Sequence, residues 1–360
     1  MSEAYFLFIG SCNRPTPYFA SARGAGLGVY RFDAETMETR QVAAYAEIDN
    51  PTFLSVRSDG KALYATSEVF GWKEGLVTAF SFDKASGAFG YINTQPSLGS
   101  IAAQSIISRD GKNLLMVNYA MGDGGPDQSL VVLPFTDEEG LHPAAISARQ
   151  RGSGPDAARQ ERSHAHSVTE VGNNVFVVAD LGCDTLTSYQ LDGNRLVKIS
   201  ESRCAPGAGP RHSVLHPNGR FLFVLNELNS TCASFAVDGK TGMLTPVNAV
   251  KALSDTAGNH CSDIQISPDG RFLYGGNRGH DSISIFGIAE NGAVELLSST
   301  PSGGKTPRNL AISPSGRHLF CANQDSDRIN IFERNATTGE IRDTGEMIET
   351  GTPMCIKIAG

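Results

Sequence analysis

An internal repeat constrains the fold of this chain more than any other feature of its sequence. Six segments share one order: an apolar stretch, a turn that contains Gly or Asn, and a second strongly apolar stretch rich in β-branched and aromatic residues. They are LSVRSDGKALYATSE, SIISRDGKNLLMVNY, SVTEVGNNVFVVADL, SVLHPNGRFLFVLNE, IQISPDGRFLYGGNR and LAISPSGRHLFCANQ. Their turn residues, at positions 60, 111, 173, 219, 270 and 316, are 51, 62, 46, 51 and 46 residues apart. This period, with hairpin signals after each copy, is typical of the four-stranded blades of a β-propeller.

The two ends of the chain complete the number of copies. FLFIGSC at residues 6–12 matches the second strand of a repeat, and TPMCIKIAG at residues 352–360 matches a first strand. Six full copies and this split copy predict an all-β fold, a seven-bladed β-propeller with four antiparallel strands per blade. Pairing the N-terminal and C-terminal segments in one blade would close the ring and remove its open edges. We therefore expect a single β-propeller domain that covers residues 1–360.

Composition and charge narrow the classes of partner. The chain has 30 Lys and Arg against 38 Asp and Glu, a net charge of −8, and no run of basic residues, so it lacks the usual patch for nucleic acid or anionic membranes. The apolar stretch near the N-terminus is too short for a membrane span or a secretory signal. Seven scattered cysteines favour a reducing compartment. We predict a cytoplasmic protein, monomeric or a weak homo-oligomer, that binds a small molecule but no nucleic acid or membrane.

Equivalent positions around the ring identify candidate site residues. The first strand of each propeller blade lines the central channel, so its entry and the exit of the second strand should meet at one mouth. Titratable and amide side chains at or next to these positions include His166, Arg211, His212, Asp263, Arg308, Asn309, Glu68, Glu227, Arg278 and Gln324. Burying so many charged groups is costly unless they serve a ligand. The alternative is a structural channel in which Arg278 pairs with Glu227, and Arg211 with Asp263.

The longest spacing contains a loop rich in arginine. It holds Arg149, Arg151, Arg159 and Arg162 and leads into the sequence HAHS. Because guanidinium groups match carboxylate and phosphate, this loop at the mouth predicts an anionic ligand. His164 and His166 alternate along a predicted strand, so their side chains point to opposite faces and only one can line the channel.

These segments resemble those of a known family. GPDAARQERSHAHSV, GAGPRHSVLHPNGRFLFVLNELNST, SPDGRFLYGGNRGHDSISIF and SGGKTPRNLAISPSGRHLFCANQDSDRI are similar to segments of the seven-bladed β-propeller lactonases, typified by bacterial 6-phosphogluconolactonase and including the fungal carboxy-muconate lactonizing enzyme. The resemblance covers residues 5–360. It implies an enzyme acting on lactones, with His166, Arg211, Glu227 and Arg278 as catalytic residues. The segment between Cys12 and Gly28 is longer than is usual in this family, and we expect it to lie by the pocket.

The candidate residues suit the opening of a lactone ring by water. We expect His166 or Glu227 to take the proton of the water, since imidazole titrates near neutral pH and the pKa of a crowded carboxylate can rise toward it. Arg211 and Arg278 would hold the anionic group of the substrate and the developing oxyanion. The expected substrate-binding residues are His212, His164, Arg308, Gln324, Glu68 and Asn309. We predict no cofactor and no metal, because an arginine-rich mouth repels cations.

Three functions are compatible with these sequence features. The first is hydrolysis of an anionic sugar lactone, of the 6-phosphogluconolactone type or an aldono- or aldarolactone. The second is a carboxy-cis,cis-muconate cycloisomerase, which needs no attacking water, so ¹⁸O from water would not enter its product. The third is a non-enzymatic propeller that binds a protein partner, which would present exposed apolar or aromatic residues on one face instead of a charged mouth.

Overall fold

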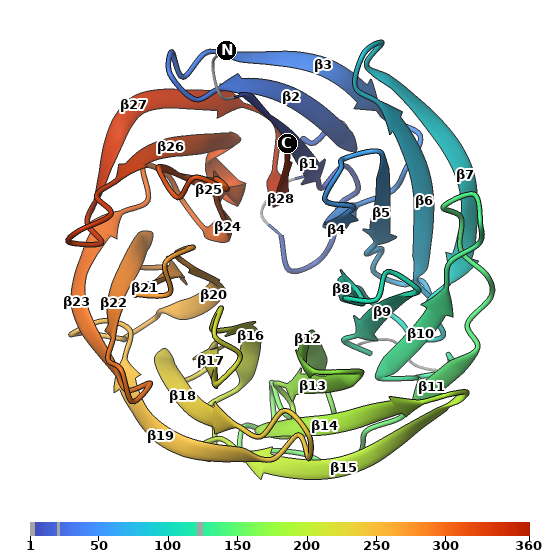
Figure 1. The fold of residues 1–360 in the computed structure, drawn as a ribbon, viewed down its shortest axis with the longest axis vertical. Coiled ribbons are helices and arrows are strands. Elements are labelled where there is room, and N and C mark those ends of the chain that lie inside the picture. The colour runs from blue at the N-terminus through green and yellow to red at the C-terminus, as the bar shows by residue number, and fades with distance from the viewer. Residues whose placement is uncertain (1–3, 20–21, 121–124) are drawn as a thin grey trace.

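A ring of seven four-stranded antiparallel sheets surrounds a central channel (Figure 1). The computed structural model describes residues 4–19, 22–120 and 125–360. Within these ranges the secondary structure is almost entirely β, and the helical element is one 3-10 turn, η1 (Gln324–Ser326). The predicted seven-bladed β-propeller is confirmed.

Each blade runs from an innermost to an outermost strand, and we number the blades in chain order. Blade 1 contains β4 (Pro51–Val56), β5 (Ala62–Ser67), β6 (Leu76–Asp83) and β7 (Ala88–Pro96). Blade 2 contains β8 (Ala102–Ile107), β9 (Asn113–Asn118), β10 (Leu130–Pro134) and β11 (Ile146–Ala148). Blade 3 contains β12 (Ala165–Gly172), β13 (Val175–Asp180), β14 (Thr185–Asp192) and β15 (Arg195–Arg203).

The remaining blades follow the same plan. Blade 4 contains β16 (Pro210–Leu215), β17 (Phe221–Asn226), β18 (Thr231–Val237) and β19 (Leu244–Lys251). Blade 5 contains β20 (His260–Ile266), β21 (Phe272–Arg278), β22 (Ser282–Ile288) and β23 (Val294–Pro301). Blade 6 contains β24 (Pro307–Ile312), β25 (His318–Asn323), β26 (Arg328–Arg334) and β27 (Ile341–Glu349). Blade 7 contains β28 (Pro353–Ala359), β1 (Ala4–Ser11), β2 (Leu27–Asp33) and β3 (Thr39–Tyr45).

Blade 7 closes the ring with the first and last strands of the chain. β28 pairs antiparallel with β1, from Phe6 opposite Ala359 to Ser11 opposite Pro353. The predicted pairing of the two terminal segments is therefore confirmed. Within the described ranges, closure leaves no inner or middle strand unpaired, so none is open to pairing with another chain.

The hydrophobic core lies between neighbouring blades. The second strands are buried on both faces, as in β17, where all six residues are buried, and they therefore read as nearly continuous apolar runs. Rings from adjacent blades pack edge to face, for example Phe32 of blade 7 and Phe320 of blade 6, with centroids 5.1 Å apart. This packing fixes the inner strands, which carry the residues of the channel.

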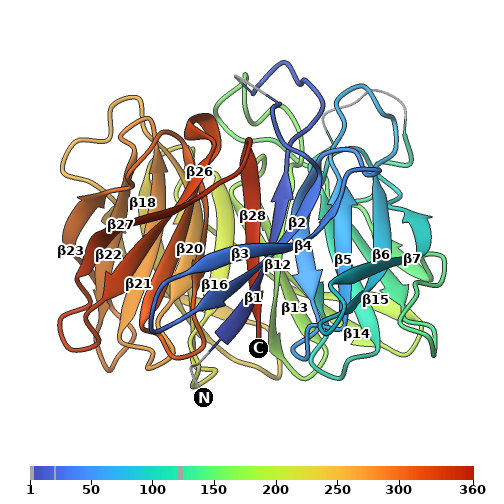
Figure 2. The same ribbon diagram turned by 90° about the horizontal axis from the view of Figure 1, so that it is seen from above.

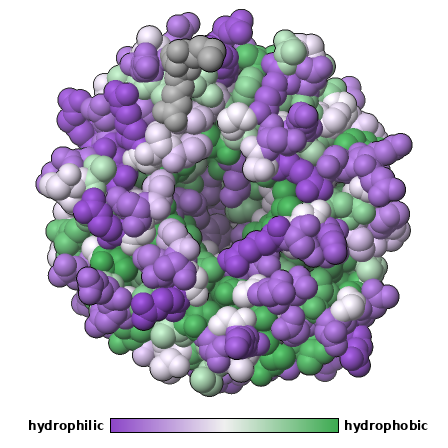
Figure 3. All heavy atoms as spheres, viewed as in Figure 1, coloured by the Kyte–Doolittle hydropathy of each residue, from purple (hydrophilic) through white to green (hydrophobic). Residues whose placement is uncertain are grey.

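The two ends of the channel differ. In Figure 2 the loop between β5 and β6 and the described part of the segment between β1 and β2 project at the end opposite to the two termini. Figure 3 shows the face that bears the termini, hollowed at its centre and surrounded mainly by hydrophilic residues. Across the described ranges, no helix is long and apolar enough to cross a membrane.

Candidate active site

A β-bulge recurs near one end of the innermost strand in all seven blades. There the register with the second strand shifts, and a bulge of this kind leaves an extra residue unpaired and re-aims its side chain. The bulge residues are Thr52, Ala103, His166, Arg211, Ser262 with Asp263, Arg308 and Met354. Outside blade 5, all of them line a pocket at the mouth opposite to the termini. The repeated bulge thus turns one position of each repeat toward a shared cavity.

This register corrects one alignment made from the sequence. Counting back from the turns placed His166 at the position of His212. In the structure β12 has a second register shift, between Glu170 and Gly172. His166 therefore shares the bulge position of Arg211, and the residue that corresponds to His212 is Ser167. The count from the turn failed because the hairpin of blade 3 is shorter: Ser167 lies six residues before Asn173, whereas His212 lies seven before Gly219.

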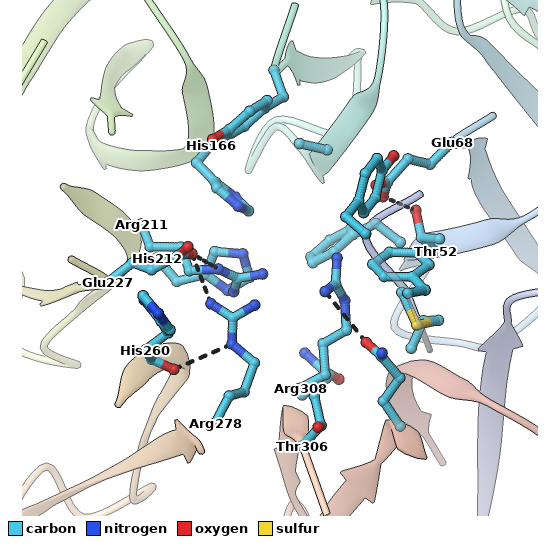
Figure 4. A pocket seen from close by; sticks show the side chains of 18 of the residues that line it. Thr52, Glu68, His166, Arg211, His212, Glu227, His260, Arg278, Thr306 and Arg308 are labelled. Atoms are coloured by element: carbon cyan, nitrogen blue, oxygen red, sulfur yellow. Dashed lines mark hydrogen bonds and ion pairs between the residues drawn. The ribbon is translucent and has the colours of Figure 1, made fainter. Parts of the chain in front are cut away.

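The pocket brings together almost all of the predicted site residues. Its volume is about 630 Å³. Figure 4 shows histidines and arginines of blades 3 to 5 on one wall, and residues of blades 1 and 6 opposite them. The predicted residues that line it are His166, Arg211, His212, Glu227, Arg278, Arg308, Asn309, Gln324 and Glu68.

His164, expected from the sequence to bind substrate, is not among the residues that line this pocket. Its side chain is buried, its Nδ1 lies 2.7 Å from the carbonyl oxygen of Tyr119, and its ring stacks on the Tyr119 ring at 4.3 Å. Tyr119 itself lines the pocket. His164 therefore supports the pocket wall from behind, as expected from the alternation of side chains along the strand.

Glu227 is the centre of the cationic wall. Its Oε1 lies 2.6 Å from Nη2 of Arg159, and its Oε2 lies 3.0 Å from Nε of Arg211 and 2.8 Å from Nη2 of Arg278. Arg211 also donates to the carbonyl oxygen of Ser262 at 2.7 Å. Three guanidinium groups thus share one carboxylate, and two of their charges are not balanced within the cluster.

The electrostatics of this cluster change the role expected of Glu227. Burial alone would raise its pKa, but Arg278, Arg211 and Arg159 together hold the pKa well below its ordinary value. The expectation of a raised pKa is therefore wrong, and a carboxylate with so low a pKa is a weak proton acceptor. Burial and the charge of Arg278 lower the pKa of Arg211 to about 9, so its guanidinium remains charged at neutral pH.

The structural alternative for these residues is only partly met. Arg278 does pair with Glu227, but Arg211 makes its ion pair with Glu227 and not with Asp263. Asp263 instead lies 2.7 Å from Nδ1 of His212.

Two neutral imidazoles face the pocket beside the cationic wall. Burial and the charge of Arg211 lower the pKa of His212 to about 4, although Asp263 opposes the shift. The same two causes, with His212 as a third, hold the pKa of His166 well below its ordinary value. The rings are in edge contact, with centroids 5.3 Å apart. Both imidazoles are therefore unprotonated acceptors at neutral pH.

The opposite wall is built on Glu68 and Arg308. Glu68 accepts hydrogen bonds from Tyr18 at 3.2 Å and from Thr52 at 2.7 Å. The guanidinium of Arg308 lies over the ring of Phe19 at 4.7 Å and forms no ion pair with a carboxylate in the part of the chain that the structure describes. A partly buried cation without a paired carboxylate favours an anionic ligand at this wall as well.

The long segment after β1 reaches this wall. The side-chain oxygen of Asn50 accepts hydrogen bonds from the backbone of Asn13 at 2.9 Å and of Arg14 at 2.7 Å. This anchor directs the chain so that Tyr18 and Phe19 line the pocket. The expectation that the segment lies by the pocket is confirmed for its described residues.

Sequence reasoning did not identify every residue of the pocket. Of the four loop arginines only Arg159 enters it, whereas Arg149 and Arg162 both pair with Asp127 at 2.6 Å. His260, whose carbonyl oxygen accepts a hydrogen bond from Arg278 at 3.2 Å, was missed because it lies before the aligned entry position. His260 could have been found from its pairing partner, because it lies opposite the exit residue Arg278 in the pairing of β20 with β21.

The described residues include no group of three or more His, Cys, Asp or Glu side chains placed to hold a metal ion. The carboxylate of Glu227, which lines the pocket, is instead paired with three arginines. The pocket chemistry is therefore that of an anion site with neutral proton acceptors.

Comparisons with known proteins agree with this chemistry. The family described as lactonase, 7-bladed β-propeller, matches residues 6–358. A 6-phosphogluconolactonase of Formosa agariphila is 34% identical and covers 93% of this chain and 94% of its own. One from Bacillus subtilis is 29% identical over 93% of this chain and 95% of its own. The solved structure of a periplasmic gluconolactonase from Pseudomonas aeruginosa superposes with a TM-score of 0.88 at 26% identity, covering 99% of both chains.

Proposed function

Because this chain belongs to the seven-bladed β-propeller lactonase family, we propose that it hydrolyses the lactone of an anionic sugar acid, with 6-phosphogluconolactone preferred over neutral aldonolactones. The observation that carries this proposal is the cluster of Arg159, Arg211 and Arg278 around the single carboxylate of Glu227. Its uncompensated charge suits a phosphate or carboxylate. The names of the two bacterial relatives support the phosphorylated substrate.

The pocket supplies what hydrolysis requires. Water must lose a proton as it attacks the lactone carbonyl, and the neutral rings of His166 and His212 are the acceptors on the wall. Arg211 and Arg278 stabilise the oxyanion and hold the anionic group of the substrate, while Glu227 orients their guanidinium groups. Arg308, Glu68, Asn309 and Gln324 bind the remaining polar groups of the sugar.

A panel of lactones tests the function. We expect faster hydrolysis, in kcat/KM, of 6-phosphogluconolactone than of unphosphorylated gluconolactone, because only the former has a dianionic group for the arginines. Acid release is measured with the spontaneous rate subtracted, and ¹⁸O-water should label the carboxylate of the product. If a muconate substrate reacted in ¹⁸O-water and its product contained no ¹⁸O, the reaction would instead be a cycloisomerisation. No enzymatic acceleration with any lactone would contradict the proposal.

The pH dependence follows from the imidazole pKa values. A catalytic base must be unprotonated, and the pKa of His212 is lowered to about 4. We therefore expect kcat/KM to be nearly constant between about pH 6 and 8 and to fall as the pH drops toward 4. Initial rates across this range, corrected for uncatalysed opening, provide the measurement. A decline centred near pH 6.5 would show that the essential imidazole keeps an ordinary pKa.

The proposed location is the cytoplasm. All seven cysteines are unpaired, and six of them are buried, which suits a reducing compartment. The Pseudomonas relative is described as periplasmic, so fractionation of the native host decides between the compartments.

A further inference from the structure

Asp263 is a buried carboxylate that forms hydrogen bonds through both of its oxygens. Its Oδ1 lies 2.7 Å from Nδ1 of His212. Its Oδ2 accepts hydrogen bonds from Nδ2 of Asn309 at 2.7 Å, the backbone of Leu310 at 3.0 Å and Nε2 of Gln265 at 3.0 Å. Asp263 therefore joins blades 4, 5 and 6 directly below the pocket.

The orientation of this network is fixed by backbone groups. The backbone N–H of Ile356 donates to Oδ1 of Asn309 at 2.8 Å, so the other side-chain atom of Asn309 must be the NH₂ group that faces Asp263. The N–H of Leu310 is also an unambiguous donor. Both donors point at Oδ2, which leaves Oδ1 as the acceptor for His212.

The contact with Asp263 determines the tautomer of His212. An ionised carboxylate only accepts hydrogen bonds, so Nδ1 of the neutral ring carries the hydrogen. Nε2 then has the lone pair and lies on the other side of the ring; the hydrogen bond that His212 forms through its ring within the described ranges is the one from Nδ1. Because His212 lines the pocket, this lone pair is available to a molecule bound there.

We propose that Asp263 is a positioning residue that makes His212 the base of the hydrolysis, an inference that rests on the proposed function. Nε2 of His212 takes a proton from water as the water oxygen bonds to the lactone carbonyl carbon. The tetrahedral oxyanion collapses, the bond from the carbonyl carbon to the ring oxygen breaks, and the imidazolium returns the proton to the departing alkoxide. The sum is lactone plus water giving the hydroxy acid.

His166 is less suited to this step. Its Nδ1 has no hydrogen-bond partner among the other residues that the structure describes, so no neighbouring carboxylate fixes its tautomer. The nearby carboxylate of Glu227 is already shared by three arginines. An imidazolium at His212 would instead be stabilised by Asp263 at 2.7 Å. A base held by a third group is the usual arrangement for activating a nucleophile.

The variant Asp263→Asn tests the proposal. The donors of Asn309 and Leu310 require an oxygen at the Oδ2 position, so the new amide must turn its NH₂ toward Nδ1 of His212. His212 is then forced into the Nε2–H tautomer and loses the lone pair that faces the pocket. We expect kcat to fall about 10²–10⁴-fold with little change in KM. In ¹⁵N-histidine NMR the His212 signal should change from the Nδ1–H to the Nε2–H form.

Two further variants complete the experiment. His212→Gln keeps a donor for Asp263 but removes the imidazole, so it should show the same loss of kcat and assigns the NMR signal. Glu170→Gln is the matched control: Glu170 is a buried carboxylate that accepts from the backbone of Arg109 at 2.7 Å, about 13 Å from His166 along β12. Its kcat should equal that of the wild type.

The outcomes separate this inference from the proposed function. An Nε2–H tautomer of His212 in the wild type, or near-normal kcat in Asp263→Asn and His212→Gln, would overturn the role of the pair while leaving lactone hydrolysis intact. A wild type that hydrolyses no lactone would refute the proposed function whatever the tautomer.

Discussion

Arg278→Met is expected to lower kcat/KM for 6-phosphogluconolactone about 10²–10³-fold, the usual effect of removing one donor that stabilises an oxyanion. Methionine preserves much of the volume of the side chain but removes its charge and its contact with Glu227 at 2.8 Å. The fold should persist, because Glu227 keeps Arg159 and Arg211 as partners. Initial rates with phosphorylated and unphosphorylated lactones provide the measurement.

The pattern across substrates identifies what Arg278 contacts. An equal loss for both lactones indicates the oxyanion, whereas a loss confined to the phosphorylated one indicates the phosphate. Arg149→Met is the control, since Arg149 pairs with Asp127 and does not line the pocket. If Arg278→Met reacts within a few-fold of this control with both lactones, Arg278 has no part in the reaction.

Glu227→Gln is expected to reduce the free energy of unfolding by about 3–5 kcal/mol, because it leaves three neighbouring guanidinium groups without their shared carboxylate. Glu227 is 4% exposed, so solvent cannot replace the lost partner. Urea unfolding of both proteins measures the difference. Inorganic phosphate should restore stability to the variant more than to the wild type, since it can occupy the position between the arginines.

The difference in free energy of unfolding between wild type and Glu227→Gln should shrink only at acidic pH. The pKa of Glu227 in the folded state is held well below its ordinary value. Its contribution to the free energy of unfolding is therefore complete above the ordinary pKa of about 4.5, and it is lost as the pH falls through the lowered pKa of the folded state. The gap between wild type and variant should therefore be constant near neutrality and narrow only in acid. Glu161→Gln, at a carboxylate that is half exposed, is the control and should change stability little. Equal stability of wild type and Glu227→Gln at pH 7 would contradict the cluster as described.

Much of the architecture could be predicted because the repeat carries it. Alternating apolar runs and turn residues give the strands, their spacing gives the blades, and the match between the two ends gives the closure by β1 and β28. The positions at the mouth followed from symmetry, so Arg211, Glu227 and Arg278 were found without any contact being known. The single-domain assignment and the oligomeric state remain predictions.

The remaining features of the site depend on three-dimensional geometry that the repeat pattern does not predict. The hairpin between the first two strands is one residue shorter in blade 3 than in blade 4, which is why counting from the turn aligns His166 with His212 when it corresponds to Arg211. The pKa of Glu227 depends on how many arginines converge on it, and the third comes from a loop whose path is not periodic. For the same reason the sequence could not show that Asp263 contacts His212 and that it does not form an ion pair with Arg211.

The joint between β1 and β28 also sets how the ring responds to mechanical force. The two strands are antiparallel, and Phe6 lies opposite Ala359, so both ends of the described chain leave from the same end of the ladder. Tension on these ends acts along the interstrand hydrogen bonds and breaks them in succession, like unzipping, instead of loading them all at once in shear. An unfolding machine that pulls on a terminus would therefore open the ring at blade 7 before it disrupts the other blades.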